Sequence, residues 1–156
     1  DIRIDDNPLL TVADMNAKCR RIENLGLVVI DYLQLMTTGG KAESRQQEVS
    51  QISRSLKLLA KEVDVPVVAV AQLNRKSEER TDKRPMMSDL RESGSLEQDA
   101  DIIMLLHRPD YYKEDDRPGE AEIHVVKHRA GATKTITALF QGHLARFANY
   151  TRRGED

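Results

Sequence analysis

Two short apolar runs on either side of an amphipathic helix constrain the fold of this chain more than any other feature. The runs occupy 27–31 and 67–71, with the sequences Leu-Val-Val-Ile-Asp and Val-Val-Ala-Val-Ala. Neither run alternates between apolar and polar residues, which is typical of parallel strands buried on both faces. The segment 43–63 predicts a helix with one buried face, because apolar residues recur three and four positions apart, at Val49, Ile52, Leu56, Leu59 and Val63. Strand, helix and strand in this order predict a parallel crossover unit.

Two further elements are predicted before this unit. Residues 2–10 alternate as a short strand would, and Thr11 with Asp14 three positions later is typical of a helix N-terminus. One face of that helix is apolar at Val12, Met15, Cys19 and Ile22. We expect Cys19 to be a small buried hydrophobic residue rather than a reactive thiol.

The C-terminal half begins with a long polar segment, 73–94, which carries both charges and Pro85. Loops of this length usually bind something or move. The elements expected after it are a short helix over 95–100, a third strand over 101–106, and a β-hairpin with arms 121–126 and 135–140 and its tip near Gly131.

Composition limits the kind of partner. Twenty-four basic residues nearly cancel 26 acidic ones, for a net charge of −2, which excludes a uniformly basic nucleic-acid coat but allows a local basic loop. The single cysteine excludes an intrachain disulfide and a thiolate zinc cluster, and fits a reducing, cytoplasmic setting. No apolar stretch approaches the roughly 20 residues of a membrane-spanning helix, so we expect no membrane partner. The chain opens on Asp1 without an initiator Met, which we interpret as a cut from something longer.

The ends of the two apolar runs carry the candidate chemistry. Asp31 closes the first run, which is the Walker B pattern for a carboxylate that holds Mg²⁺ beside nucleotide phosphates. Gln72 follows the second run and could bond a γ-phosphate or orient water. Taken alone, each residue also fits an ordinary cap or loop role. The phosphate-binding loop GxxxxGK[ST] occurs nowhere in the 156 residues.

Five segments follow one another along the chain: Asp31–Met36, Ala71–Arg75, Asp82–Pro85, Ser88–Asp101 and Lys127–Gly131. Their sequences and their order resemble the C-terminal motor domain of DnaB-type bacterial replicative DNA helicases, and the resemblance runs from about Ile4 to Tyr150. It implies an α/β fold: an incomplete RecA-like core with a mainly parallel sheet flanked by helices, a C-terminal β-hairpin, and no P-loop strand or helix. The expected domains are a partial motor domain over 1–150 and a polar tail over 151–156.

The resemblance also implies roles for particular residues. Asp31 matches the Walker B carboxylate, and Gln72 matches the γ-phosphate sensor that links nucleotide state to the following DNA loop. Arg91, Glu92 and Gly94 match positions that contact single-strand phosphates. For Arg91 this agrees with its charge, and for Gly94 with the close approach of a backbone N–H.

Lys127 and Arg129 match a pair that reaches the nucleotide of a neighbouring subunit, with Arg129 as the arginine finger. Spacing of two residues on a strand places both side chains on one face, and a cation supplied in trans neutralises charge on the transferred phosphoryl group. His128 between them has no assigned role. The resemblance further implies ATP with Mg²⁺, a homohexameric ring that translocates on single-stranded DNA, and a cytoplasmic site at the replication fork. Primase and a helicase loader are expected to bind regions outside this chain.

The leading hypothesis is therefore the second half of a helicase motor domain. The intact parent is a DNA-dependent ATPase, and the isolated chain is expected to lack turnover, because the family's Walker A residues and catalytic glutamate lie upstream of Asp1. The alternative is a non-enzymatic RecA-like module that binds DNA or protein through the 73–94 segment. A RecA-type recombinase or a circadian-clock-type ATPase is a third possibility, which the block 88–101 disfavours.

Overall fold

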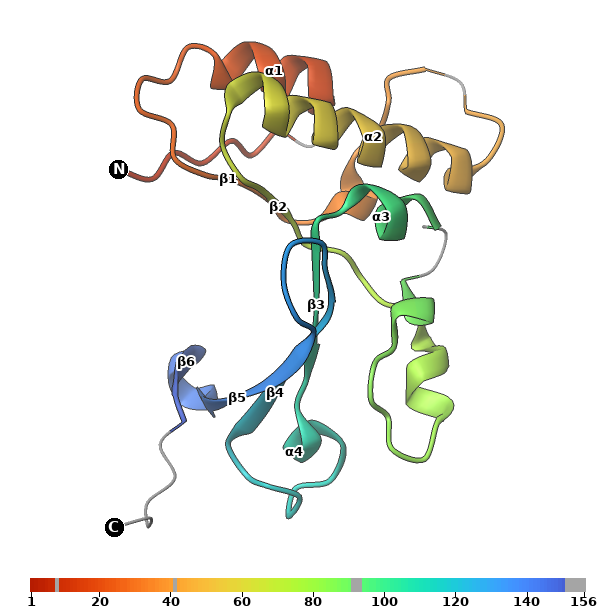
Figure 1. Cartoon of the computed structure of the whole chain (residues 1–156), viewed down its shortest axis with the longest axis vertical. Coiled ribbons are helices and arrows are strands. Elements are labelled where there is room, and N and C mark those ends of the chain that lie inside the picture. Colours follow the sequence, from red (N-terminus) through yellow and green to blue (C-terminus); the bar gives the residue numbers. More distant parts are fainter. Residues whose placement is uncertain (8, 41, 91–93, 151–156) are drawn as a thin grey trace. The chain divides into compact units, whose positions relative to one another are not determined.

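The computed structural model describes residues 1–7, 9–40, 42–90 and 94–150 (Figure 1). Contacts group the chain into two compact units. The first comprises Asp1–Asn74 with Leu90–Ala100, and the second Arg75–Asp89 with Asp101–Asp156. The predicted polar tail, 151–156, lies outside the described residues, so the division into 1–150 and 151–156 stays a prediction.

The first unit contains the predicted parallel crossover. Strands β1 (Val28–Ile30) and β2 (Val67–Ala69) pair in parallel, with Val28 opposite Val67. The long helix α2 (Arg45–Val63) connects them and confirms the strand–helix–strand prediction. Helices α1 and α2 lie together on one side of the two strands (Figure 1). The unit's other elements are α1 (Val12–Cys19), the 3₁₀ helix η1 (Leu33–Leu35) and α3 (Gly94–Asp99), which confirms the short helix expected near residue 95.

Local sequence explains where the two main helices begin. The Thr11 hydroxyl accepts a hydrogen bond from the backbone N–H of Asp14 at 3.2 Å, which completes the predicted cap of α1. Ser44 does the same for Gln47 at the start of α2. The core between these helices and the strands consists of Met15, Cys19, Ile30, Leu33, Met36, Val49, Ile52, Leu56 and Leu59. Cys19 is therefore buried as predicted, and burial raises the pKa of its thiol.

Two expectations for this unit are wrong. The strands are not buried on both faces, since Val29 is 59% exposed and Val68 41% exposed. Helices α1 and α2 pack on one face only, which leaves the other face uncovered by the described residues of this unit. Residues 2–10 form no strand where the structure describes them, and Ile2 is 89% exposed. A strand needs a neighbouring strand for its backbone hydrogen bonds, and no strand pairs with this described segment.

The second unit is built on a four-stranded antiparallel sheet in the order β3-β4-β5-β6. Its strands are β3 (Ile102–His107), β4 (Glu120–His128), β5 (Lys134–Gln141) and β6 (Arg146–Asn149). Strands β4 and β5 confirm the predicted C-terminal hairpin. The remaining elements are the helix α4 (Pro109–Tyr112) and the 3₁₀ helices η2 (Arg75–Glu79), η3 (Met87–Asp89) and η4 (Gly142–Leu144).

The α/β class is confirmed, but parallel pairing is less extensive than predicted. Among the described residues, parallel pairing is confined to β1 and β2. The third predicted strand, β3, pairs antiparallel with β4, because the chain reverses through α4 and returns directly alongside β3. None of the helices in the described part of the chain combines the length and apolar character needed to cross a membrane.

Candidate nucleotide and nucleic-acid site

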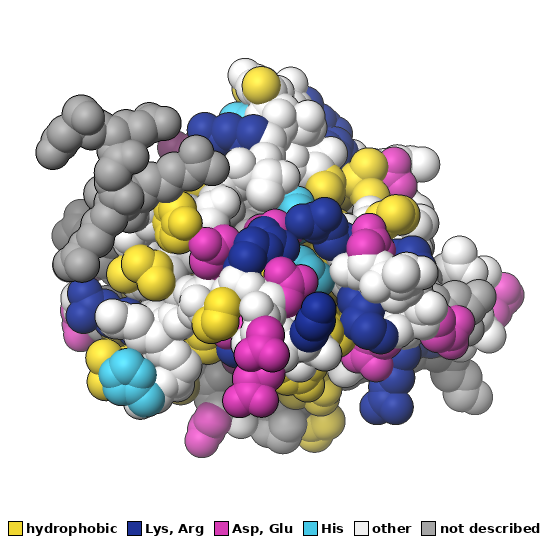
Figure 2. Space-filling model, turned by 90° about the horizontal axis from the view of Figure 1, so that it is seen from below, with side chains coloured by type: hydrophobic (Ala, Val, Ile, Leu, Met, Phe, Trp, Pro, Cys, Tyr) yellow, Lys and Arg dark blue, Asp and Glu magenta, His cyan; other side chains and the backbone are white. Residues whose placement is uncertain are grey.

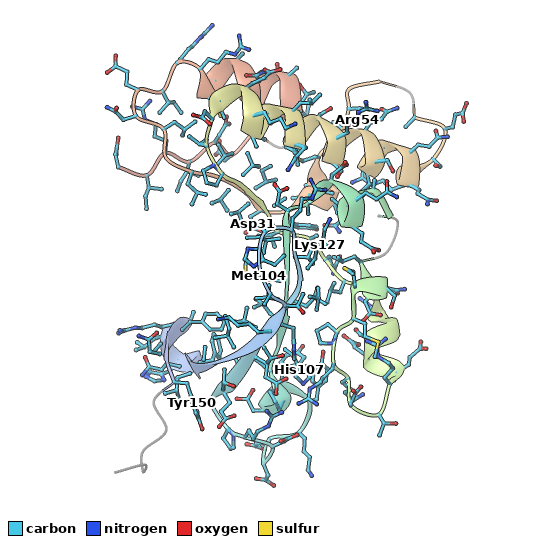
Figure 3. The ribbon with its side chains drawn as sticks, viewed as in Figure 1. Asp31, Arg54, Met104, His107, Lys127 and Tyr150 are labelled. Atoms are coloured by element: carbon cyan, nitrogen blue, oxygen red, sulfur yellow. The ribbon has the colours of Figure 1, made fainter. Side chains whose placement is uncertain are left out.

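Asp31 and Gln72 emerge from the carboxyl ends of the two parallel strands, where open parallel sheets bind their ligands. Asp31 directly follows β1 and its side chain is exposed (Figure 3). Backbone bonds continue the pairing beyond the strands: Val70 donates to the carbonyl of Ile30 at 2.9 Å, and Leu33 donates to the carbonyl of Val70 at 2.8 Å. The structure therefore brings the two predicted residues to adjacent chain segments.

Gln34 joins these two segments and was not singled out from the sequence. Its side-chain Oε1 accepts a hydrogen bond from the backbone N–H of Gln72 at 3.1 Å. Its Nε2 donates to the backbone carbonyl of Gln72 at 3.2 Å. Because the partner is a backbone 38 positions away, no local pattern in the sequence identifies this glutamine.

The start of the loop that begins at Thr37 is held by hydrogen bonds to α2. Arg45 donates to the carbonyls of Gln34 at 2.9 Å and Met36 at 3.1 Å. Glu48 accepts a hydrogen bond from the Thr37 hydroxyl at 2.9 Å. Hydrogen bonds from Arg45 and then Thr37 lower the pKa of Glu48 below its ordinary value. The first turn of α2 therefore holds the segment that follows Asp31.

The carboxylate of Asp31 suits a limited part in metal binding. No group of three His, Cys, Asp or Glu side chains that could hold a metal gathers among the residues the structure describes. Mg²⁺ commonly keeps several waters and substrate phosphate oxygens as ligands and uses only one or two carboxylates. An exposed strand-end carboxylate fits that chemistry as one contributor and does not form a metal site by itself.

Lys127 and Arg129 form the second candidate group, in the second unit. Lys127, which is labelled in Figure 3, lies in β4 opposite Ile103, and Arg129 directly follows the strand. The backbone N–H of Arg129 donates to the carbonyl of Asp101 at 2.8 Å, which extends the pairing by one residue. The Arg129 guanidinium lies 3.3 Å from the Asp101 carboxylate, and both side chains are more than half exposed. An exposed ion pair of this kind is weak, so the guanidinium can exchange Asp101 for another anion.

The residues expected to contact DNA are only partly described. Arg91 and Glu92 lie outside the described residues, whereas Gly94 begins α3 and is exposed. A Cβ at Gly94 would meet nothing within 4 Å. This open backbone is compatible with the close approach predicted for Gly94. Figure 2 shows Lys and Arg side chains interspersed with Asp and Glu on the face it presents, in agreement with the exclusion of a uniformly basic coat.

The polar segment 73–90 is hydrogen-bonded to the antiparallel sheet through Glu122 of β4. Arg84 donates twice to the Glu122 carboxylate, at 3.1 and 3.0 Å, and Arg117 donates to one of the same oxygens. Burial alone would raise the pKa of Glu122, but the hydrogen bonds and charges of the two arginines outweigh it and lower the pKa to about 2. Beside this cluster, burial lowers the pKa of His107, at the end of β3 (Figure 3).

A parallel crossover with a carboxylate and an amide at adjacent strand ends, together with an antiparallel hairpin, defines an α/β chain of the RecA-like class. The sequence pattern of the DnaB-like helicase C terminal domain matches residues 1–149. The chain belongs to this family.

Curated relatives and solved structures agree with the assignment. The chain is 62% identical over 153 residues to replicative DNA helicase DnaB of Mycobacterium leprae, covering 96% of the chain and 25% of that protein. It is 52% identical to the protein of that name from Geobacillus stearothermophilus, covering 99% of the chain and 35% of that protein. The chain thus spans between a quarter and about a third of these relatives.

Two solved structures share the fold. One is of a DnaB-like replicative helicase, described with its interactions with primase; it has a TM-score of 0.91 at 44% identity, over 96% of this chain and 38% of that one. The other is the ATPase domain of G40P, with a TM-score of 0.86 at 45% identity, over 90% of this chain and 52% of that one. The RecA-like α/β core expected from the resemblance is therefore confirmed.

Proposed function

We propose that this chain is the second half of the motor domain of an ATP-driven replicative DNA helicase. One observation carries the proposal: Asp31 and Gln72 lie at the ends of adjacent parallel strands, in a chain whose relatives are named replicative DNA helicases. In the whole protein the motor unwinds duplex DNA by translocating on single-stranded DNA. Its cellular place is the replication fork in the cytoplasm.

The first unit supplies groups that respond to the nucleotide. Bound ATP would supply the phosphoryl group that is hydrolysed. Mg²⁺ would supply positive charge that offsets the negative charge of the phosphates. Asp31 would hold Mg²⁺ through bound water, because its exposed carboxylate lies directly after the end of β1. Gln72 senses the γ-phosphate through its side-chain amide and passes the nucleotide state to the segment that follows it.

That segment leads to the DNA contacts. Arg91 pairs with a phosphate of the single strand, and Glu92 and Gly94 contact the backbone through their own main chain. A cation and closely approaching N–H groups bind phosphates without reading sequence, as a translocating motor requires. Binding of this kind weakens with added salt.

Lys127 and Arg129 serve the nucleotide of a neighbouring subunit in a homohexameric ring. Arg129 leaves Asp101 for the γ-phosphate and stabilises the charge that develops there, so hydrolysis depends on ring assembly. Lys127 approaches the same phosphates from its position in β4. Primase and a helicase loader bind parts of the whole protein that precede the motor.

Replacing Arg129 tests this assignment. In the full-length helicase that contains these residues, Arg129→Ala should lower DNA-stimulated ATP turnover by about a thousandfold, the typical effect of an arginine finger. Nucleotide binding, measured with a fluorescent ATP analogue, should change little, because the finger acts mainly on the transition state. Loss of nucleotide binding together with turnover would contradict the finger role.

A further inference from the structure

The parallel strands that carry Asp31 and Gln72 are short, and they end before the two residues. Each strand has three residues, and the last paired positions are Ile30 and Ala69. Two backbone hydrogen bonds, through Val70, carry the pairing one step further. Beyond this point the backbone of Gln72 has no strand beside it among the described residues.

The side chain of Gln34 takes the place of that missing strand. A backbone amide in a sheet offers one acceptor and one donor to its neighbour, and the Gln34 carboxamide offers the same pair. Its Oε1 accepts from the N–H of Gln72 at 3.1 Å, and its Nε2 donates to the carbonyl of Gln72 at 3.2 Å. Both backbone groups of one residue are thus held by one side chain.

Gln34 is itself held from two sides. It lies in η1 directly after Leu33, which is 1% exposed and packs in the core. Its own carbonyl accepts a hydrogen bond from Arg45 of α2 at 2.9 Å. The carboxamide is therefore presented from a fixed backbone, three positions after Asp31.

We propose that Gln34 is a positioning residue, which fixes the Gln72 backbone relative to Asp31 so that the sensor amide meets the γ-phosphate in register. The inference rests on the proposed function of Gln72. Misplacement of a catalytic group by about 1 Å costs up to a hundredfold in rate. Loss of the Gln34 hydrogen bonds is therefore expected to lower ATP turnover.

The test uses Gln34→Met in the full-length helicase, since methionine keeps the length of the side chain and removes both hydrogen bonds. Gln72 is exposed, so water can satisfy its backbone groups and the variant is expected to fold. Gln51→Met is the matched control, because Gln51 is exposed on α2. Turnover with single-stranded DNA is measured against ATP concentration for each protein.

Gln34→Met should lower kcat about tenfold while KM for ATP stays within about twofold, the split expected when orientation rather than binding is lost. The control should match the wild type. If the substitution only disturbed packing, it would instead lower the midpoint of thermal unfolding without lowering kcat selectively over KM. Wild-type kcat in Gln34→Met would overturn the proposal.

A double-mutant cycle with Gln72→Ala identifies the route of the effect. If Gln34 acts through Gln72, adding Gln34→Met to Gln72→Ala should change kcat by less than about twofold. Independent, multiplying effects would overturn the inference while leaving the sensor role of Gln72 intact. Full turnover in Gln72→Ala alone would instead contradict the sensor role of Gln72, and with it the positioning role of Gln34.

Discussion

The imidazole ring of His128 lies against the backbone of Gly131, in the turn that follows Arg129. A Cβ at residue 131 would lie 2.5 Å from Nδ1 of this ring, closer than real side chains approach. The backbone N–H of Gly131 also donates to the His128 carbonyl at 3.4 Å. The His128 ring, to which the sequence assigned no role, therefore packs against the turn beside the proposed arginine finger, and glycine at residue 131 leaves room for it.

Gly131→Ala should destabilise the isolated chain by about 1 kcal/mol, because the added methyl group forces the His128 ring to shift. Urea unfolding followed by circular dichroism measures the change. Gly26→Ala is the matched control, since a Cβ at Gly26 meets nothing within 4 Å. Equal effects of the two substitutions would contradict the packing of His128 on Gly131.

Among the elements, β4 connects the antiparallel sheet to the polar segment that precedes the residues proposed to contact DNA. It places the Glu122 side chain, 6% exposed, where Arg84 and Arg117 both donate to it. Breaking a buried ion pair from one side costs more than the pair contributes. The ion pairs that join the sheet to the loop around Arg84 therefore require Glu122 to be ionised.

This arrangement predicts acid sensitivity. The pKa of Glu122 is lowered in the fold from 4.5 to about 2, so its contribution is complete above pH 4.5 and is lost as the pH falls toward 2. Unfolding free energies of the wild-type chain and Glu122→Gln, measured from pH 7 to pH 2, should differ by about 2 kcal/mol near neutrality. The difference should vanish near pH 2. A difference that stays constant with pH would contradict the role of the ionised carboxylate.

The same elements show what the sequence could predict. The Thr11 cap and apolar periodicity predicted α1, periodicity alone predicted α2, and the turn near Gly131 predicted the hairpin, because these signals act through neighbours in the chain. The Ser44 cap of α2 was not predicted. The exposure of Val29 and the antiparallel partner of β3 depend on which elements come to lie beside them, which no local pattern encodes. For the site, Asp31 and Gln72 were predicted at adjacent strand ends. Gln34 was missed because its partner is a distant backbone.

Across all 156 residues, the sequence contains the proposed Walker B carboxylate, Asp31, and the proposed finger, Arg129, but no GxxxxGK[ST] loop. The isolated chain should therefore show no ATP turnover with Mg²⁺ and single-stranded DNA in a coupled assay, because this loop is the motif that binds the phosphates. Asp31→Ala is the control for contaminating activity and should give the same background. Turnover that this substitution abolishes would show that the chain is active by itself.

In the proposed ring, Arg129 and Asp31 belong to one nucleotide site built from two subunits. Full-length Arg129→Ala and Asp31→Ala proteins, each with little turnover, should be unfolded, mixed in equal amounts and reassembled. DNA-stimulated ATP turnover of the mixture is then compared with the mean of the two separate proteins. We predict a clear recovery, because some interfaces then combine an intact Asp31 with an intact Arg129 from the adjacent subunit. Mixed rings, confirmed by tagging each variant differently, that show no more turnover than that mean would contradict the claim.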